Sequence, residues 1–240
     1  MKLALIGYGK MGKEIESIAL ERGHSIVFKV NSGNKNFPVS DLTDCDAAIE
    51  FTNPDSVVAN IEKCFLGNVP VVVGTTGWYQ HFSEIESLCK KGNHSMLHAT
   101  NFSIGVNIFF EINKRLAKLM NVQKNYDVMV EEIHHTQKLD APSGTGITIA
   151  EDIVKNISRK NKWISGESKN ETDLNIFSQR IDNIPGTHLV KYSSSIDDIE
   201  IKHVAHNRKG FALGAVLAAE WLKDKKGIFK MNDVLQLKAD

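Results

Sequence analysis

The chain has 240 residues, in which 29 lysines and arginines balance 29 aspartates and glutamates, so the formal net charge is zero. A hydrophobic fraction of 42% and a charged fraction of 24% are typical of a globular protein with a sizeable core. Zero net charge argues against a nucleic-acid-binding protein, because such proteins need a basic face. The length suits one large domain or two modest ones.

The first residues and the cysteines predict a soluble cytoplasmic protein without membrane association. The apolar run after Lys2 ends at Gly7, too early for the apolar region of a secretory signal peptide. The longest apolar stretch, residues 211–219, is too short to span a bilayer. The cysteines number three and show no Cys-x-x-Cys or zinc-ligand spacing. We therefore expect reduced thiols and no metal.

The first hundred residues alternate short apolar runs with helix-like segments, which predicts a parallel sheet with helices on both faces. Residues 11–19 have helical spacing, and Gly23 is expected just past the end of that helix. Asn53 as N-cap and Pro54 in the first turn predict a second helix that runs to about Phe65. The predicted strands are residues 3–6, 26–30, 47–51, 69–73 and 96–99.

The pattern changes after Asn101, where longer predicted strands follow one another between turns. Residues 104–119 have helical spacing, with Ile104, Ile108, Ile112, Leu116 and Leu119 on one stripe, and residues 145–157 are also predicted to form a helix. The polar residues 159–172 are expected to form a mobile loop. The predicted strands are residues 126–133, 174–181, 188–194 and 199–206.

These patterns predict an α/β protein with two domains. Residues 1–103 and 209–240 form a Rossmann-like, dinucleotide-binding domain with a parallel sheet. Residues 104–208 form a second, α+β domain with a mixed sheet.

A G-x-G-x-x-G sequence follows the first predicted strand and opens the first helix. Glycines in this position let backbone N–H groups approach a pyrophosphate at a helix N-terminus. The alternative is a plain tight turn, and Lys10 is either a phosphate contact or a solvated lysine. In this context the motif predicts dinucleotide binding by Gly7, Tyr8, Gly9, Lys10, Met11 and Gly12.

The second predicted strand ends without the acidic residue that commonly holds the ribose hydroxyls of NAD. Asn31 stands there instead, and an amide does not repel the extra phosphate of NADP. We therefore expect NADPH to be accepted as well as NADH, with Asn31 at the ribose.

Two further polar turns follow strand ends, where ligands of such sheets bind. Alone, each would be an ordinary turn. Together with the glycine loop they predict a nicotinamide site that includes Gly74, Thr75, Thr76, Ala99, Thr100, Asn101 and Phe102.

Residues 132–145 carry the densest set of chemically active side chains. His134, His135 and Lys138 can transfer protons or hold carboxylates near neutral pH. The turn at residues 142–145 opens a helix, whose N–H groups suit an anionic substrate. The alternative is a structural histidine pair, and a zinc site is not expected because no further His or Cys stands nearby.

The run from His134 to Thr145 resembles the signature of the 4-hydroxy-tetrahydrodipicolinate reductase (dihydrodipicolinate reductase) family of diaminopimelate and lysine biosynthesis. The resemblance extends to residues 7–12, 74–77, 101–107, 208–222 and 227–235. It implies NAD(P)H-dependent reduction of (2S,4S)-4-hydroxy-2,3,4,5-tetrahydrodipicolinate, a small dicarboxylate, to (S)-2,3,4,5-tetrahydrodipicolinate. It also implies that residues 104–208 bind the substrate and that the sheet of this domain builds a homotetramer.

The resemblance further implies that His134 donates or accepts a proton and that Lys138 is a second proton donor. His135, Gly144 and Thr145 would hold the carboxylates of the substrate. Thr136-Gln137 departs from a basic pair that is common in the family, which predicts a less positive site. Two alternatives stay open, namely another reductase on the same fold and a non-catalytic NAD(P)-binding sensor.

Overall fold

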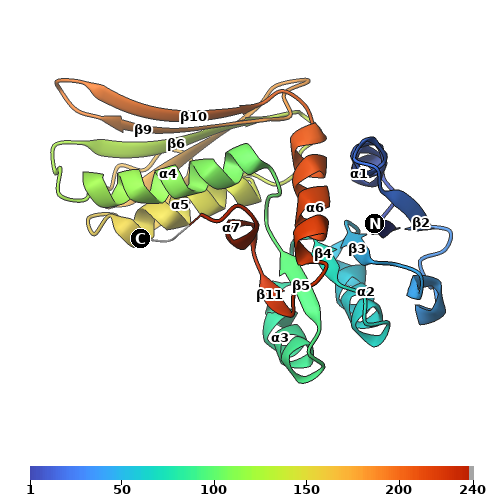
Figure 1. Ribbon diagram of the computed structural model, residues 1–240. Coiled ribbons are helices and arrows are strands. Elements are labelled where there is room, and N and C mark those ends of the chain that lie inside the picture. The colour runs from blue at the N-terminus through green and yellow to red at the C-terminus, as the bar shows by residue number, and fades with distance from the viewer. Residues whose placement is uncertain (238–240) are drawn as a thin grey trace. The chain divides into compact units, whose positions relative to one another are not determined.

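The computed structural model describes residues 1–237, which form two compact units (Figure 1). The first unit contains residues 1–104 and the described chain from Arg208 onward, and the second contains residues 105–207. Each unit has its own sheet. No helix within residues 1–237 combines the length and the apolar character needed to cross a membrane.

The first unit is built on a six-stranded parallel sheet in the order β11-β5-β4-β3-β1-β2. The chain passes from β1 to β2 on one side and then crosses to β3 on the other side of β1. This reversal is the switch point at which doubly wound sheets bind their ligands. The strands are β1 (Lys2–Ile6), β2 (Ser25–Val30), β3 (Ala47–Glu50), β4 (Val71–Val73), β5 (Ser95–His98) and β11 (Gly227–Phe229).

Alternate residues along these strands enter two separate cores, one on each face of the sheet. Leu3 and Leu5 of β1 pack with α1 and α6, whereas Ala4 and Ile6 pack with α2 and α3. Asn53 caps α2 as predicted, since its side chain accepts hydrogen bonds from the backbone N–H of Asp55 and Ser56. The helices are α1 (Lys10–Glu21), α2 (Pro54–Leu66), α3 (Phe82–Lys91), α6 (Lys209–Leu222) and α7 (Met231–Val234), with 3-10 turns at Val39–Leu42 and Tyr79–His81.

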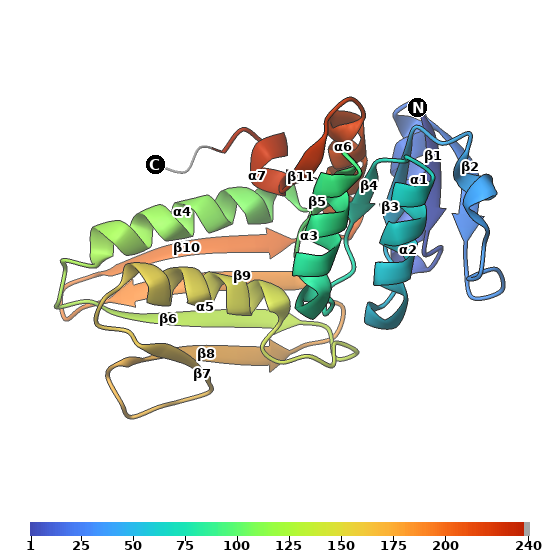
Figure 2. The same cartoon turned by 90° about the horizontal axis from the view of Figure 1, so that it is seen from below.

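The second unit is built on a mixed five-stranded sheet in the order β10-β9-β6-β8-β7. The β6, β8 and β7 pairings are parallel, and β9 pairs antiparallel with both β6 and β10. Helices α4 (Ile104–Met120) and α5 (Gly144–Asn156) cover one face of this sheet (Figure 2). The strands are β6 (Asp127–His134), β7 (Lys162–Ser165), β8 (Asp173–Arg180), β9 (Gly186–Ser193) and β10 (Asp198–Ala205).

Strand β6 turns alternate side chains toward the helices. Val128 and Val130 enter the core between sheet and helices, and the next two inward positions are the polar residues Glu132 and His134. A strand that buries its apolar half therefore also buries a carboxylate and an imidazole at its carboxyl end.

The helix expected from residue 104 is present, but its buried face differs from the predicted one. Ile108, Ile112 and Leu119 of the predicted stripe are exposed. The face toward the sheet carries two phenylalanines and the buried Asn113, whose side-chain amide donates to the carbonyl of Ile149. Because α4 is apolar on two faces, spacing alone selected the wrong stripe.

The segment expected to be a mobile loop, residues 159–172, contains β7, so the expectation is wrong for this strand. Lys160, whose side chain is 2% exposed, forms an ion pair of 2.7 Å with Asp127. Its ammonium also donates 2.8 Å hydrogen bonds to the carbonyls of Glu171 and Asp173. Because the segment is polar in composition, its sequence did not indicate that this cation is buried. The hydrogen bonds of Lys160 join the residues before β7 to the residues at the start of β8.

Candidate functional site

The glycine loop of the first unit lies at the carboxyl end of β1. Gly7 has φ +105°, and a Cβ there would lie 2.0 Å from the carbonyl oxygen of Phe51. A Cβ at Gly12 would lie 2.4 Å from the carbonyl oxygen of Gly7. Both positions therefore need glycine for the fold itself.

Gly9 differs, because a Cβ there would meet no atom within 4 Å. The helix that follows, α1, has no side-chain cap and no acidic residue in its first turn. Open space and a positive helix end fit a cofactor pyrophosphate, which the backbone N–H groups of this turn would hold.

Tyr8 forms the side of this loop that faces α1 and β2. Its hydroxyl donates to Glu16, and the ammonium of Lys29 lies 4.6 Å from the centre of its ring. Lys29 also pairs with Glu16 at 2.5 Å. Hydrogen bonds from Lys29 and Tyr8 hold the pKa of Glu16 below its usual value. Lys10 is exposed, and Met11 packs partly against the core.

Asn31 directly follows β2, where the adenosine ribose of a dinucleotide lies in this fold class. Its Oδ1 accepts a 2.8 Å hydrogen bond from the N–H of Gly33, and its own N–H donates to Asn34. The side chain is therefore held in a turn at the end of the strand.

The other two predicted turns follow β4 and β5. Thr75 accepts a hydrogen bond from the N–H of Thr52 through its hydroxyl and another from Trp78 through its carbonyl, each at 2.8 Å. Asn101 accepts from the N–H of Ser103. The structure brings all the predicted cofactor residues to one edge of the sheet: Gly7, Tyr8, Gly9, Lys10, Met11, Gly12, Asn31, Gly74, Thr75, Thr76, Ala99, Thr100, Asn101 and Phe102.

Glu50 is a polar residue at this edge that sequence reasoning missed. It ends β3, is fully buried, and accepts hydrogen bonds from Thr52 and Asn60. Burial raises its pKa. The hydrogen bond from Thr52 ties Glu50 to the turn that follows β3. The sequence signal for this residue was a carboxylate at the end of an apolar run.

The proposed catalytic residues belong to the second unit, around the loop from β6 to α5. His134 ends β6, His135 follows it, and Gly144 and Thr145 form the first turn of α5. Ser143 caps this helix by accepting a 3.0 Å hydrogen bond from the N–H of Gly146. A Cβ at Gly144 would meet no atom within 4 Å, so this helix end has room for a ligand.

Arg180 and an internal ion pair hold the loop between these elements. The ammonium of Lys138 lies 2.8 Å from Oδ1 of Asp140. Arg180 of β8 donates to the carbonyl oxygens of Lys138, at 3.2 Å, and of Asp140, at 2.5 Å. Lys138 therefore reaches the site from an ordered loop.

His134 is buried in a group of side chains with Glu132, which begins the predicted segment but had no role assigned there, and with His188, which sequence reasoning missed. The ring centres of His134 and His188 lie 5.1 Å apart, with the planes at 72°. His188 comes from β9, where it pairs in register with Glu132. Its 54-residue separation from His134 hid it from a search of sequence neighbours, and strand alternation was the only available signal.

Burial dominates the protonation of both imidazoles. It lowers the pKa of His134 to about 4 and that of His188 to about 3. Glu132 opposes this effect at both rings, while Lys138 and Arg180 reinforce it at His134. Ligand atoms of Glu132, His134 and His188 lie within 4.8 Å of one another, but the carboxylate already accepts hydrogen bonds from Ser143 and Ser178, so we assign no metal ion to this group.

The first unit has a doubly wound sheet with an open glycine loop, and the second unit carries buried titratable side chains. These features together are those of an NAD(P)-dependent oxidoreductase. Protein-family models for the N-terminus and the C-terminus of dihydrodipicolinate reductase match residues 1–102 and 105–235. The chain belongs to the dihydrodipicolinate reductase family.

Curated relatives agree with this assignment. A 4-hydroxy-tetrahydrodipicolinate reductase of Christiangramia forsetii is 49% identical over 98% of both chains. Another, of Buchnera aphidicola, is 33% identical over 89% of this chain and 82% of its own. A solved structure, dipicolinate-bound dihydrodipicolinate reductase from Paenisporosarcina, has a TM-score of 0.77 at 22% identity, covering 96% of this chain and 97% of the other. The predicted fold class, family and use of a nicotinamide cofactor are confirmed.

Proposed function

We propose that the protein reduces (2S,4S)-4-hydroxy-2,3,4,5-tetrahydrodipicolinate to (S)-2,3,4,5-tetrahydrodipicolinate, with His134 and Lys138 as the groups that move protons. The observation that carries the proposal is the placement of a buried imidazole beside Glu132 at the end of β6, in the same loop region as Lys138 and the open N-terminus of α5. The names of the curated relatives support the choice of substrate.

The second unit supplies positive groups for a dicarboxylate. His135, Gly144 and Thr145 hold the substrate's carboxylates, where the N–H groups of the first turn of α5 and the helix dipole favour negative charge. Lys138 adds a cation. Its ammonium leaves Asp140 when a carboxylate of the substrate takes the place of the Asp140 carboxylate. Two negative charges close to His134 raise its pKa from the low value of the free protein, so substrate binding itself favours the imidazolium.

When bound, NADH or NADPH supplies the hydride, and the residues Gly7–Gly12, Asn31, Gly74–Thr76 and Ala99–Phe102 would hold it. After loss of water, the substrate contains a conjugated C=C–C=N system, to which one hydride and one proton must add. His134 or Lys138 gives the proton from the protein side, which general acids do effectively when positioned beforehand. The cytoplasm is the proposed location, because that is where nicotinamide cofactors and reduced thiols are found together.

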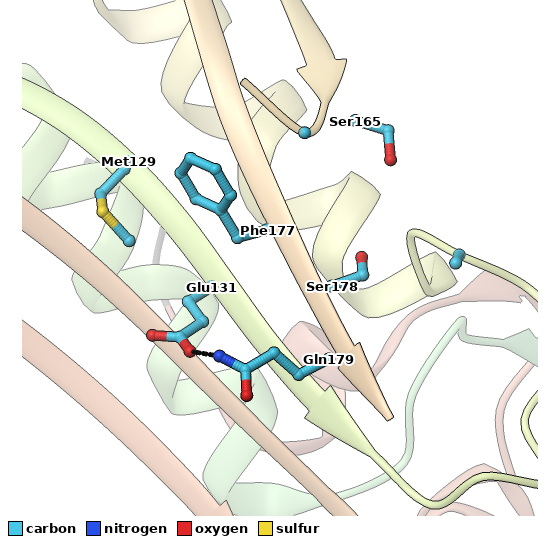
Figure 3. A pocket seen from close by; sticks show the side chains of 8 residues that line it. Met129, Glu131, Ser165, Phe177, Ser178 and Gln179 are labelled. Carbon is cyan, nitrogen blue, oxygen red and sulfur yellow. Dashed lines mark hydrogen bonds between the residues drawn. The ribbon is translucent and has the colours of Figure 1, made fainter. Parts of the chain in front are cut away.

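The sheet face opposite α4 and α5 is the proposed assembly surface. A hollow in this face is lined by Met129, Glu131, Phe177 and Gln179 (Figure 3). The side-chain amide of Gln179 donates a hydrogen bond to the carboxylate of Glu131. Half-buried apolar side chains among polar ones suit a surface that packs against other copies of the chain, and four such faces packed together would build the homotetramer. Light scattering coupled to size-exclusion chromatography tests this, since a monomeric mass would contradict it.

The function is tested by the loss of absorbance at about 340 nm with NADH and with NADPH, when the substrate is made in place from pyruvate and aspartate semialdehyde by a separate synthase. Oxidation that depends on the synthase supports the proposal. Tight cofactor binding without oxidation would favour another substrate or a sensor. His134→Gln and Lys138→Ala should lose turnover and keep cofactor binding, and full activity of both variants would refute the assigned roles.

A further inference from the structure

Glu132 is a fully buried carboxylate whose two oxygens both accept hydrogen bonds. Oε1 accepts 2.9 Å hydrogen bonds from the hydroxyl of Ser178 and from the N–H of Ser143, and Arg180 approaches it at 3.4 Å. Oε2 accepts from the hydroxyl of Ser143 and, at 3.1 Å, from the same N–H of Ser143. Burial raises the pKa of Glu132, but the hydrogen bonds from Ser143 and Ser178 outweigh it and leave the pKa below its usual value. Glu132 is therefore an anion at neutral pH.

The same Oε2 atom faces two imidazoles. Nδ1 of His134 lies 3.8 Å from it and Nε2 of His188 lies 3.9 Å from it. Within the described part of the chain no group forms a hydrogen bond to the buried Nδ1 of His134. A small rotation of the ring would bring this nitrogen into contact with the carboxylate, whereas the carboxylate itself is fixed by its donors.

The other ring nitrogen of His134 has a different environment. A Cβ at Gly186 would lie 3.2 Å from Nε2, so this glycine leaves the Nε2 side of the ring uncrowded. A Cβ at Gly146 would lie 2.7 Å from Oε2 of Glu132, so a second glycine lets α5 approach the carboxylate. The ring is bounded by an anion on its Nδ1 side, by His188 at its edge, and by backbone without a side chain at Nε2.

We propose that Glu132 is the positioning residue of the reaction: it holds the Nδ1 edge of His134 and compensates the charge of the imidazolium, so that the transferred proton leaves from Nε2. Because it is also tied to Ser143, it fixes His134 and the substrate-binding end of α5 to a single buried charge. The inference rests on the proposed role of His134 as a proton donor.

Other charged groups near His134 act on its pKa in both directions. Lys138 and Arg180 both disfavour the imidazolium, and Asp140 favours it from the partly exposed loop. His188 is held neutral by burial and does not compete for the negative charge near neutral pH. Glu132 is thus the buried anion that faces the ring directly.

The test is Glu132→Gln, with Glu167→Gln as a control. Glu167 is an exposed carboxylate of the same unit, in the connection between β7 and β8. Since the charge of Glu132 raises the pKa of His134, its removal lowers that pKa further. The descending alkaline limb of kcat should then move to lower pH, and kcat at pH 8 should fall at least about tenfold while the KM for NAD(P)H is unchanged. Glu167→Gln should leave the pH profile of kcat in place.

Glu132→Asp keeps the charge, so the alkaline limb of its kcat profile should lie close to that of the unchanged protein. An unshifted pH profile of kcat in Glu132→Gln would overturn the proposal. Equal losses of kcat in Glu132→Gln and Glu132→Asp, with unshifted profiles, would indicate a purely structural role and would also overturn it. Circular dichroism checks that each variant is folded.

A measurement on the unchanged protein covers the case in which Glu132→Gln does not fold. Nitrogen-15 NMR of the neutral His134 ring should show the proton on Nδ1, the nitrogen that faces Glu132, and a proton on Nε2 would contradict the inference. This readout does not require turnover. It therefore separates failure of the Glu132 assignment from failure of the proposed function, which the synthase-coupled assay tests.

Discussion

The ammonium of Lys138 lies 2.8 Å from Oδ1 of Asp140, so the second proposed proton donor is paired within its own loop before any substrate arrives. The pairing sets the direction of Lys138, because Arg180 fixes the backbone of both residues. A carboxylate of the substrate can then replace Asp140 without moving the loop.

Asp140→Asn should keep the loop backbone but release the lysine side chain. We expect kcat to fall about tenfold, the typical scale for disturbing a positioned acid, with little change in NAD(P)H affinity. Steady-state kinetics with both substrates varied will measure this. Glu167→Gln, an exposed carboxylate of the same unit, is the control. An unchanged kcat in Asp140→Asn would show that the ion pair does not orient Lys138.

The glycine loop contains positions with opposite requirements. Gly7→Ala should lower both the melting temperature and cofactor affinity, because alanine at φ +105° is strained and its Cβ would collide with Phe51. Gly9→Ala should leave the melting temperature within about 2 °C, since nothing surrounds that position in the protein alone.

Cofactor affinity should nevertheless fall in Gly9→Ala, because the added methyl group would occupy the space in which the pyrophosphate must approach the backbone. Thermal unfolding and titration of NADPH fluorescence distinguish the two effects. Equal NADPH affinity of Gly9→Ala and the unchanged protein would place the phosphates elsewhere.

Most of the fold could be predicted because local signals and tertiary structure agree in the first unit. Short apolar runs, the Asn53 N-cap and the glycine loop each specify an element by themselves. The second unit was harder, since α4 has apolar residues on two faces and only the packed structure shows that Ile108 and Ile112 point outward.

The proposed acid–base site illustrates a different limit. His134 and Lys138 stand in one short segment, so the sequence alone brings them forward as candidates. His188 joins them only through the antiparallel register of β6 and β9, which pairs it with Glu132. No local sequence pattern predicts which strands pair when they lie far apart in the chain.

Gly186 offers a test of the space around His134. In Gly186→Ala the new Cβ would lie 3.2 Å from Nε2 of His134, a contact that requires the ring or the strand to move by a few tenths of an ångström. Because Nε2 is the nitrogen proposed to deliver the proton, we expect kcat to fall about tenfold or more, with the KM for NAD(P)H unchanged. Gly166→Ala, at a position with open space but positive φ, should affect stability rather than kcat.

The buried ammonium of Lys160 predicts a stability effect without a catalytic one. Lys160→Met removes the hydrogen bonds to two carbonyl groups, and we expect a loss of about 1–3 kcal/mol in the free energy of unfolding. The loss of its ion pair adds little, since Asp127 is 75% exposed. Urea unfolding measures the change, and Lys162→Met, at an exposed position two residues on, is the control. Equal stability of both variants would contradict the structural role of Lys160.

Asn31 predicts how cofactor preference can be changed. Aspartate at this position can still accept the hydrogen bond from Gly33, so Asn31→Asp should keep the turn and add one negative charge. That charge favours ribose hydroxyls and repels the 2′-phosphate of NADP, so the ratio of kcat/KM for NADH to that for NADPH should rise about tenfold, equivalent to roughly 1.4 kcal/mol. Asn36→Asp adds the same charge at an exposed position nearby and should change the ratio much less. The oxidation rates of both cofactors under identical salt give the ratio directly. An unchanged ratio in Asn31→Asp would mean that the ribose does not bind beside this residue.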